Sequence, residues 1–401
     1  MSEPSFDPSQ ALRDVQHFGE EGGVVPVIDV ASTSTFLDPE DMVRTFHGER
    51  GCYLYSRHSN PSVNAFGRKL AALEQTEAAL GVASGMSAIA AAILQLLPEG
   101  GHIVSSRTVY GGTYALFQNM LPRWGIQVTL VDFGDLAAVE RAIGPKTRLL
   151  YTETMSNPLL SVTDLPAVAR LAHARGLQLV VDNTFTPCLV TPARLGADVV
   201  VHSGTKYLSG ASDLIAGVIA GPKAFVDQLV DINQGVVMLT GPVMDPRVAH
   251  ELYLRLDHLP IRMQAHGRAA QMLAEALQAA DVPVIYPGLS AHPHHALLGR
   301  LKNPGYGSGG MMAVDCGTAD RAMQLARRLQ DENFGLYAVS LGFSRTLMSC
   351  SSVTTSSEIP EAEQRSMNLS PGLLRLSIGY VGDDQVMANR FLRCYRALPK
   401  A

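Results

Sequence analysis

Short apolar runs alternate with amphipathic helical patterns through the middle of the chain. Runs such as "TRLLYTET", "LQLVVDN" and "ADVVVHS" have the length of buried strands. Between the first two lies "DLPAVARLAHARG", whose apolar residues recur at helical spacing. Strands that alternate with helices of about ten to fifteen residues indicate βαβ units and a parallel sheet. The pattern therefore predicts an α/β fold built on a mostly parallel sheet.

The regular alternation of apolar runs and helical patterns ends after residue 245. A long helical pattern leads into a mixed region with strand-like "MMAVDC" and "LLRLSIGY". The first fifty residues are irregular and offer little core of their own. We therefore predict an N-terminal arm over residues 1–50, a large domain over 51–245 and a smaller C-terminal α+β domain over 246–401.

One uncharged stretch, from Ala78 to Leu97, is twenty residues long and could span a bilayer by length alone. However, polar residues interrupt it, and Gly85 stands where a helix would begin. We predict a short buried strand, a turn and a buried helix here, and no membrane span.

Composition narrows the range of partners. The formal net charge of −5 gives no electrostatic reason to expect nucleic acid or an anionic membrane. The five cysteines are scattered and form no C-x-x-C pair, which is typical of free thiols in a reducing compartment. The N-terminal stretch is polar and acidic and is unlike a signal peptide. We expect a cytoplasmic protein.

Several polar residues follow predicted strands, at the sheet edge where ligands bind in open parallel sheets. "LVVDN" ends in Asp182, "VVVHSGTK" leads to Lys206, and "LLYTETMSNP" leads to Asn157. In "GVASGMSAI", residues 84–86 connect a strand to a helix. Because the free N–H groups at a helix N-terminus bind anions, this turn is a candidate phosphate site.

A lysine, an aspartate and a phosphate-binding turn are parts that pyridoxal phosphate requires. Lys206 can form an imine with the cofactor aldehyde, and Asp182 can keep the pyridine nitrogen protonated. The hydroxyls of Ser203 and Thr205 can complete the phosphate site, and the Tyr110 ring in "RTVYGGTY" can lie on the cofactor. The alternative is that Lys206 only ends a strand and points at water.

Seven motifs decide between these interpretations. The chain resembles the cysteine/methionine-metabolism family of pyridoxal-phosphate enzymes, over residues 25 to 395, in "YSRHSNPS", "SGMSAI", "VYGGT", "VVDNTF", "GADVVVHSGTKYLSG", "AVSLG" and "LLRLSIG". This family contains γ-lyases, γ-synthases and homoserine-ester sulfhydrylases. The resemblance implies the fold type I of pyridoxal-phosphate enzymes, which is like that of aspartate aminotransferase. It also implies a homo-oligomer, usually a tetramer of paired dimers.

The resemblance also assigns roles to residues. The catalytic residues would be Lys206, Tyr110 and Asp182. The cofactor would be bound by these three and by Ser84, Gly85, Met86, Asn157, Ser203 and Thr205, with Tyr55 and Arg57 contributed by a neighbouring subunit. The substrate carboxylate would be held by Arg375, whose guanidinium suits bidentate binding, assisted by Ser340, Asn157 and Tyr110.

The chain departs from the family pattern in its specificity loops. The methionine γ-lyases that it resembles have a cysteine in place of Gly112, and a Lys-Asp pair in place of Val237 and Met238. After "SLG", this chain has Arg345 where an acidic residue is common and Cys350 where a His-Pro begins. These differences count against methionine as the dedicated substrate.

The serine-rich stretch 349–357 predicts a polar pocket wall. Such a wall suits a γ-substituent with hydrogen-bonding groups, such as an O-acyl, O-phospho or guanidinooxy group. Glu358 and Asp213, if they face the pocket, could meet the cationic end of canavanine. The alternative, equally weighted, is that this loop takes no part in recognition.

We therefore expect a pyridoxal-phosphate γ-lyase acting on a γ-substituted L-amino acid. The alternatives are a γ-synthase or sulfhydrylase, then a β-lyase, and, from another class, a catalytically idle binding protein. The histidines of "AHPHHALLG", residues 292, 294 and 295, are dense enough for a metal site, but no second ligand cluster accompanies them. We expect no bound metal.

Overall fold

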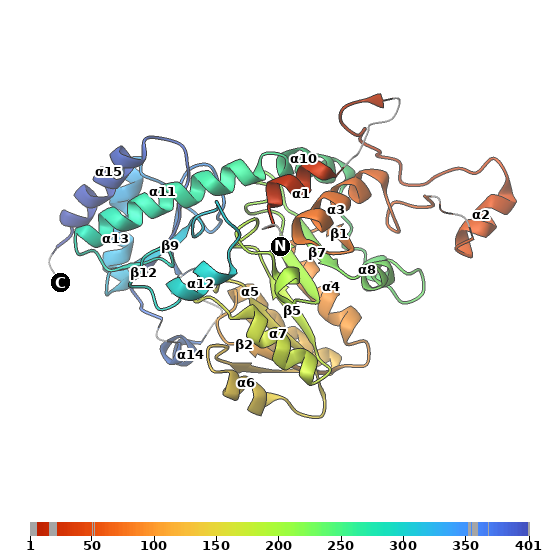
Figure 1. Ribbon diagram of the computed structural model, residues 1–401, viewed down its shortest axis with the longest axis horizontal. Coiled ribbons are helices and arrows are strands. Elements are labelled where there is room, and N and C mark those ends of the chain that lie inside the picture. The colour runs from red at the N-terminus through yellow and green to blue at the C-terminus, as the bar shows by residue number, and fades with distance from the viewer. Residues whose placement is uncertain are drawn as a thin grey trace, which may run out of the picture.

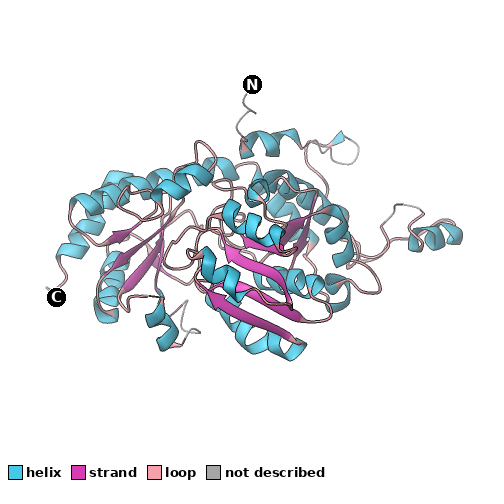
Figure 2. Cartoon of the chain, turned by 60° about the horizontal axis from the view of Figure 1, so that its bottom comes forward, coloured by secondary structure: helices cyan, strands magenta, loops and turns pink. Residues whose placement is uncertain are grey.

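Two β-sheets, one mostly parallel and one mostly antiparallel, organise the chain (Figures 1 and 2). The computed structural model describes residues 6–15, 22–49, 51, 53–351, 354, 360–367 and 369–399. Helices cover the sheets, and the chain passes from the first sheet to the second through one long helix (Figure 1). The α/β class predicted from the sequence is confirmed.

The larger sheet has seven strands in the order β1-β7-β6-β5-β4-β2-β3. Strand β7 runs antiparallel to both of its neighbours, and the other pairs are parallel. The strands are β1 (Ala78–Val82), β2 (Gly101–Ser106), β3 (Ile126–Val131), β4 (Thr147–Glu153), β5 (Gln178–Asp182), β6 (Val199–Ser203) and β7 (Gly217–Gly221). The carboxyl ends of β4, β5 and β6 therefore meet at one edge.

Helices lie on both faces of this sheet, as parallel strands require. One face packs against α4 (Gly85–Leu96), and the other packs against α3 (Pro61–Glu74) and α7 (Leu165–Ala174), among others. The remaining helices of this part are α5 (Gly111–Ala115), α6 (Leu136–Ala142), α8 (Lys223–Leu229), α9 (Val236–Thr240) and α10 (Pro246–Leu256).

Strand alternation decides which face each residue joins. Tyr151, Val180 and Val201 pack in the core on the α4 face. Because side chains two residues apart share a face, the strand-end residues Glu153, Asp182 and Ser203 also lie on that face. Three polar side chains from adjacent strands are thus gathered above the N-terminus of α4.

The uncharged stretch from Ala78 to Leu97 forms strand β1, a turn and helix α4, as predicted. Ser84 caps the helix: its Oγ accepts from the Ser87 N–H at 3.1 Å, and the Ser87 Oγ accepts from the Ser84 N–H at 2.9 Å. This reciprocal capping fixes where the helix starts. In the described part of the chain, no helix has the length and apolar character needed to cross a membrane.

The second sheet has five strands in the order β10-β11-β12-β9-β8, antiparallel except for the pair β10 and β11. They are β8 (Val284–Ile285), β9 (Met311–Asp315), β10 (Leu336–Tyr337), β11 (Leu347–Cys350) and β12 (Leu373–Ser377). The helices here are α11 (Leu259–Ala279), α12 (His295–Leu301), α13 (Ala319–Asp331), α14 (Glu361–Ser366) and α15 (Asp384–Arg396).

The change from one core to the other occurs within α11. Ala249 and Leu252 of α10 are buried in the core of the larger sheet, and so is Met263 near the start of α11. Leu273 and Leu277, further along the same helix, are buried in the core of the second sheet. The domain division at residues 245 and 246 stays a prediction, and this packing favours a boundary inside α11.

The N-terminal arm splits into two parts. Helix α1 (Pro8–Asp14) packs on α3 and buries Leu12. Residues 26–29 still contact the body, since the Asp29 N–H donates to Ser62 Oγ at 2.9 Å, whereas α2 (Pro39–Phe46) extends away from it (Figure 1). Helix α2 buries none of its residues, and Leu37 is fully exposed. Between residues 22 and 49, the arm offers apolar surface that this chain does not cover.

The turn at the start of α4 is pressed against strand β7, and this contact gives a first prediction. A Cβ added at Gly217 would lie 1.9 Å from the Ser84 carbonyl oxygen and 2.8 Å from the Gly85 nitrogen. Gly217→Ala should therefore push the turn away and lower the free energy of unfolding by about 1–3 kcal/mol, as overpacking does. Urea unfolding measures the change.

Gly144 supplies the matched control, because a Cβ there would meet nothing within 4 Å. Gly144→Ala should change the free energy of unfolding by no more than about 0.5 kcal/mol. Equal stability of the two variants would contradict the tight contact between β7 and the turn.

Candidate active site

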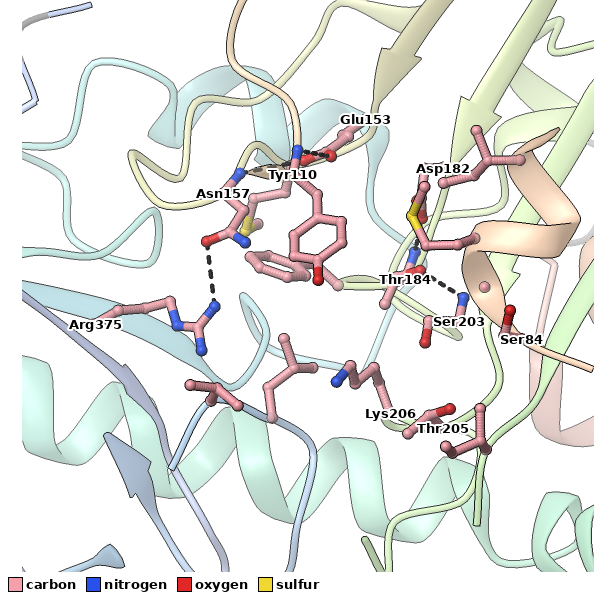
Figure 3. Close-up of a pocket in the computed structure, with 18 residues that line it drawn as sticks. Ser84, Tyr110, Glu153, Asn157, Asp182, Thr184, Ser203, Thr205, Lys206 and Arg375 are labelled. Atoms are coloured by element: carbon pink, nitrogen blue, oxygen red, sulfur yellow. Dashed lines mark hydrogen bonds between the residues drawn. The ribbon is translucent and has the colours of Figure 1, made fainter. Parts of the chain in front are cut away.

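A cavity of about 260 Å³ opens at the carboxyl ends of β4, β5 and β6 (Figure 3). Residues from both sheets and from the turn before α4 meet in it. It is lined by Ser84, Gly85, Met86, Ile89, Tyr110, Glu153, Met155, Asn157, Asp182, Thr184, Phe185, Ser203, Thr205, Lys206, Ile215, Val339, Leu341 and Arg375. Ten of the residues expected at the site from the sequence are among them.

Lys206 lies in the turn after β6, and its side chain points into the cavity (Figure 3). Its Nζ donates a hydrogen bond to Ser340 Oγ at 3.0 Å. Burial lowers the pKa of Lys206 from its ordinary value to about 8, and the positive charge of Arg375 adds to the effect. A lysine with this pKa is partly neutral near neutral pH, so it can act as a nucleophile or a base.

Asp182 ends β5 and faces the same cavity (Figure 3). Its Oδ1 accepts from the Thr184 N–H at 2.9 Å, and Thr184 Oγ1 in turn accepts from the Ser203 N–H at 2.8 Å. Burial raises the pKa of Asp182, while its hydrogen bonds from Thr184 oppose the rise. A positively charged ring nitrogen placed beside it would favour the ionised carboxylate.

Glu153 ends β4 beside Asp182 and was not among the residues expected from the sequence. Its Oε1 accepts from the Tyr110 N–H at 2.6 Å, and its Oε2 accepts from the Asn157 N–H at 3.2 Å. Burial and then the charge of Asp182 raise the pKa of Glu153 well above its ordinary value, and the two N–H groups oppose this rise. The strand-end rule that indicated Asn157 in "TETMSNP" also covers Glu153.

Arg375, on β12 of the second sheet, reaches the cavity from the opposite side (Figure 3). Its guanidinium donates to Asn157 Oδ1 at 3.3 Å and to the Ser340 carbonyl oxygen at 3.3 Å. The residue is only 3% exposed, and burial lowers its pKa to about 10. Within the described ranges it forms no ion pair with a carboxylate, so it can bind one from a ligand.

The turn before α4 has the properties of an anion site. Helix α4 begins at Gly85 directly at the cavity, and Ser203 and Thr205 line the same end. Helix N-termini carry free N–H groups and a partial positive charge. The donor set therefore fits a phosphate group, and with Lys206 and Asp182 it fits pyridoxal phosphate.

Tyr55 and Arg57 do not reach the cavity of their own chain. Tyr55 is 46% exposed, and Arg57 Nη1 donates to the Met238 carbonyl oxygen at 2.7 Å. Their role at the site of a neighbouring subunit stays a prediction. Ser340 does not line the cavity either, but it touches Lys206 and Arg375 as described above.

The polar wall expected after "SLG" does not form from the described residues. Cys350 and Ser351 are buried, Arg345 is exposed, and none of the three lines the cavity. Asp213 is held by both Nη atoms of Arg255 at 2.7 Å and is also absent from the lining. Residues 352–353 and 355–359, which include Glu358, lie outside the described residues.

Three apolar side chains also line the cavity. Val339 and Leu341 precede the serine-rich stretch in the sequence, and Ile215 follows the lysine turn. Ile215 and Val339 are both more than two-thirds exposed, at 69% and 68%. These side chains therefore give the mouth of the cavity an apolar character.

The three histidines of "AHPHHALLG" connect loops. His294 Nδ1 accepts from the Val162 N–H at 2.7 Å, and His292 Nδ1 accepts from the His294 N–H at 3.1 Å. His295 Nδ1 lies 2.9 Å from the Pro287 carbonyl oxygen. Among the described residues, no group of three or more His, Cys, Asp or Glu side chains could hold a metal ion.

Comparison with known proteins agrees with this geometry. The family model described as "Cys/Met metabolism PLP-dependent enzyme" matches residues 10–389. A methionine gamma-lyase of Arabidopsis thaliana is 46% identical over 384 residues, which cover 94% of this chain and 87% of the relative. An O-succinylhomoserine sulfhydrylase of Pseudomonas aeruginosa is 36% identical over 389 residues, which cover 96% of this chain and 94% of the relative.

One solved structure resembles this chain over nearly the whole length of both. It is that of an O-acetylhomoserine (thiol)-lyase from Campylobacter jejuni, with a TM-score of 0.89 and 25% sequence identity. The match covers 98% of this chain and all of that one. That structure contains a pyridoxyl-lysine phosphate, which is the cofactor joined to a lysine.

The lowered pKa of Lys206 gives a prediction for the cofactor-free protein. Because only the neutral amine reacts, competitive acetylation of Lys206 should rise with pH through a midpoint near 8. In denaturant the midpoint should return to the ordinary lysine value of about 10.4. Mass spectrometry of the Lys206 peptide measures both.

Arg375→Met should raise the folded midpoint, because it removes a nearby positive charge, while leaving the part caused by burial. A folded protein whose Lys206 titrates as it does in denaturant would refute the buried, cation-flanked lysine.

Proposed function

The chain belongs to the Cys/Met metabolism family of pyridoxal-phosphate-dependent enzymes, and from that premise we propose that it is a γ-lyase. The reaction is γ-elimination from a γ-substituted L-amino acid. The observation that carries the proposal is the meeting of Lys206, Asp182 and Arg375 in one cavity beside the start of α4. The similarity to a methionine gamma-lyase favours elimination over replacement.

The cofactor, when bound, supplies an electron sink for the carbanion that forms at the substrate Cα. Arg375 binds the substrate carboxylate and is itself oriented by Asn157 and Ser340. With the cofactor bound, Lys206 would move the protons at the substrate carbons, and its lowered pKa suits this work. Tyr110 at the cavity supplies a proton to the leaving group.

For the γ-substituent, we propose a thioether such as that of methionine. The described lining offers Ile215, Val339 and Leu341 for an apolar group. An O-substituted homoserine or canavanine, expected from the sequence, would need polar or anionic partners. Asp213 already pairs with Arg255. A γ-synthase or sulfhydrylase remains the second candidate, because the O-succinylhomoserine sulfhydrylase relative matches over nearly its whole length.

We further propose that the working enzyme is a homo-oligomer with shared sites. The exposed apolar residues of the arm, Val24 and Leu37 among them, would be covered by a neighbouring subunit. Arg57 and Tyr55 form a cation–π pair, with the guanidinium carbon 5.4 Å from the ring centroid, on an exposed surface. From there they would complete the phosphate site of the neighbour.

Product analysis tests the reaction. The purified holoenzyme should release 2-oxobutanoate from L-methionine without any added nucleophile, faster than it turns over L-canavanine, cystathionine or O-acetylhomoserine. Lys206→Ala should release none, since it removes the group that moves the protons. If product forms only when a thiol or sulfide is added, and is a new amino acid, the synthase candidate is correct. Faster turnover of canavanine would overturn the apolar pocket.

Hybrid oligomers test the shared site. Arg57→Ala and Lys206→Ala, each inactive alone, are co-expressed with different tags and purified together. Each hybrid dimer should hold one intact site and regain up to about half of the wild-type activity. Hybrids of Asp182→Ala with Lys206→Ala are the control: both changes affect a subunit's own site, so no activity should return. Inactive Arg57 hybrids would show that the site is not shared.

A further inference from the structure

Glu153 is a buried carboxylate at the cavity to which no step of the proposed reaction has been assigned. It is 6% exposed, and it ends β4 where the strand meets the site. We propose that Glu153 is the positioning residue that holds the Tyr110 and Asn157 segments in their working geometry. The roles given to Tyr110 and Asn157 in catalysis rest on the proposed function. The contacts by which Glu153 holds them are independent of it.

The two segments that Glu153 joins come from different parts of the fold. Tyr110 precedes α5, in the connection after β2, and its N–H donates to Glu153 Oε1 at 2.6 Å. Asn157 lies in the turn that follows β4, and its N–H donates to Oε2 at 3.2 Å. The one carboxylate therefore holds two backbone positions, one with each of its oxygens. Figure 3 shows both contacts above the Tyr110 ring.

The connection extends to the substrate side of the cavity. The Asn157 side chain accepts from Arg375 Nη1 at 3.3 Å. A shift of the Asn157 turn would therefore move the partner of the guanidinium that binds the substrate carboxylate. Displacement of the Tyr110 segment would move the ring that protonates the leaving group. Glu153 thus links the group that holds the substrate to the group that acts on it.

Helix α5 begins without a side-chain cap. Its N-cap residue is Tyr110. Helix N-termini leave N–H groups without intrahelical partners, and a carboxylate is a favourable acceptor near them. The helix is also short, five residues, before it continues as a π-helical turn. A carboxylate delivered from a strand is therefore a strong determinant of where Tyr110 lies.

The position of Glu153 is electrostatically costly, which argues for a role. It is paired in register with Asp182, so two carboxylates lie side by side at one strand edge. Burial, and then the charge of Asp182, disfavour the charged form of Glu153 and raise its pKa. An uncharged residue would avoid this cost but would offer fewer acceptor sites. The carboxylate accepts hydrogen bonds from two backbone N–H groups, those of Tyr110 and Asn157, and we infer that this is its role.

Glu153→Gln tests the proposal in the cofactor-free protein. Glutamine keeps the size, but its amide offers one oxygen, so one of the two N–H groups loses its acceptor. Amide hydrogen exchange, followed by mass spectrometry, should quicken at Tyr110 or Asn157 by roughly 10- to 100-fold, as expected for loss of one charge-assisted hydrogen bond. Exchange at other strand ends should not change. Unchanged exchange at both positions would overturn the proposal.

Glu74→Gln is the matched control. Glu74 is 1% exposed and lies on the opposite face of the same sheet, where its Oε1 accepts from His202 Nε2 at 2.8 Å and from Asn183 Nδ2 at 3.1 Å. This change alters a buried carboxylate away from the site, so it should leave exchange at Tyr110 and Asn157 unchanged. If both variants quicken exchange everywhere alike, Glu153 acts only on general stability, and the proposal fails.

A double-mutant cycle in the holoenzyme tests whether Glu153 acts through Tyr110. Glu153→Gln should lower kcat by at least tenfold in the wild-type background and much less in Tyr110→Phe, because coupled residues are not additive. Additive losses would overturn the link. If Glu153→Gln does not fold, Glu153→Asp replaces it in this test. Its side chain is one methylene shorter, so the carboxylate no longer reaches both N–H groups. Absence of lyase activity would refute the proposed function, but the exchange result would stand by itself.

Discussion

Two carboxylates, Glu153 and Asp182, end adjacent parallel strands on one face of the larger sheet, and the arrangement of the site follows from accommodating them. Like charges so close in a poorly solvated place need donors or cations nearby. The protein supplies Thr184 to Asp182, and the N–H groups of Tyr110 and Asn157 to Glu153. The hydrogen-bond donors that stabilise these two carboxylates therefore belong to the same segments that carry the site residues.

The cavity also holds two basic side chains, Lys206 from the turn after β6 and Arg375 from β12 of the second sheet, and their different surroundings matter as much as their charge. Lys206 and Arg375 lie close enough for Arg375 to depress the lysine pKa, yet each is tied to the same residue, Ser340, through a different atom. Burial keeps the amine partly neutral, while the guanidinium, with its much higher pKa, stays charged. One cation can thus bind a carboxylate while the other exchanges protons.

The fold and the centre of the site could be predicted from the sequence because both depend on local patterns. Strand periodicity places Asp182 and Lys206 at one edge, and the motifs then indicate Tyr110 and Arg375. Glu153 lies under the same rule, but its importance comes from two backbone N–H groups that no pattern reveals. The sequence suggested that Asp213 could face the pocket, but its carboxylate pairs with Arg255 on α10 instead. This pairing could not be foreseen, because the two residues are 42 positions apart in the sequence.

The two sheets must keep a fixed relation for the site to work, and the bonds that ensure this surround Lys206. Ser340 and Arg375 come from the second half of the chain and meet Lys206 and Asn157 from the first. Behind the lysine turn, Arg262 of α11 donates to the Tyr207 and Leu208 carbonyl oxygens at 2.6 and 3.1 Å. Because α11 is also the helix in which one core gives way to the other, any movement between the sheets would pull on the residues next to the lysine. The position of the reactive amine is therefore set by the packing of both sheets.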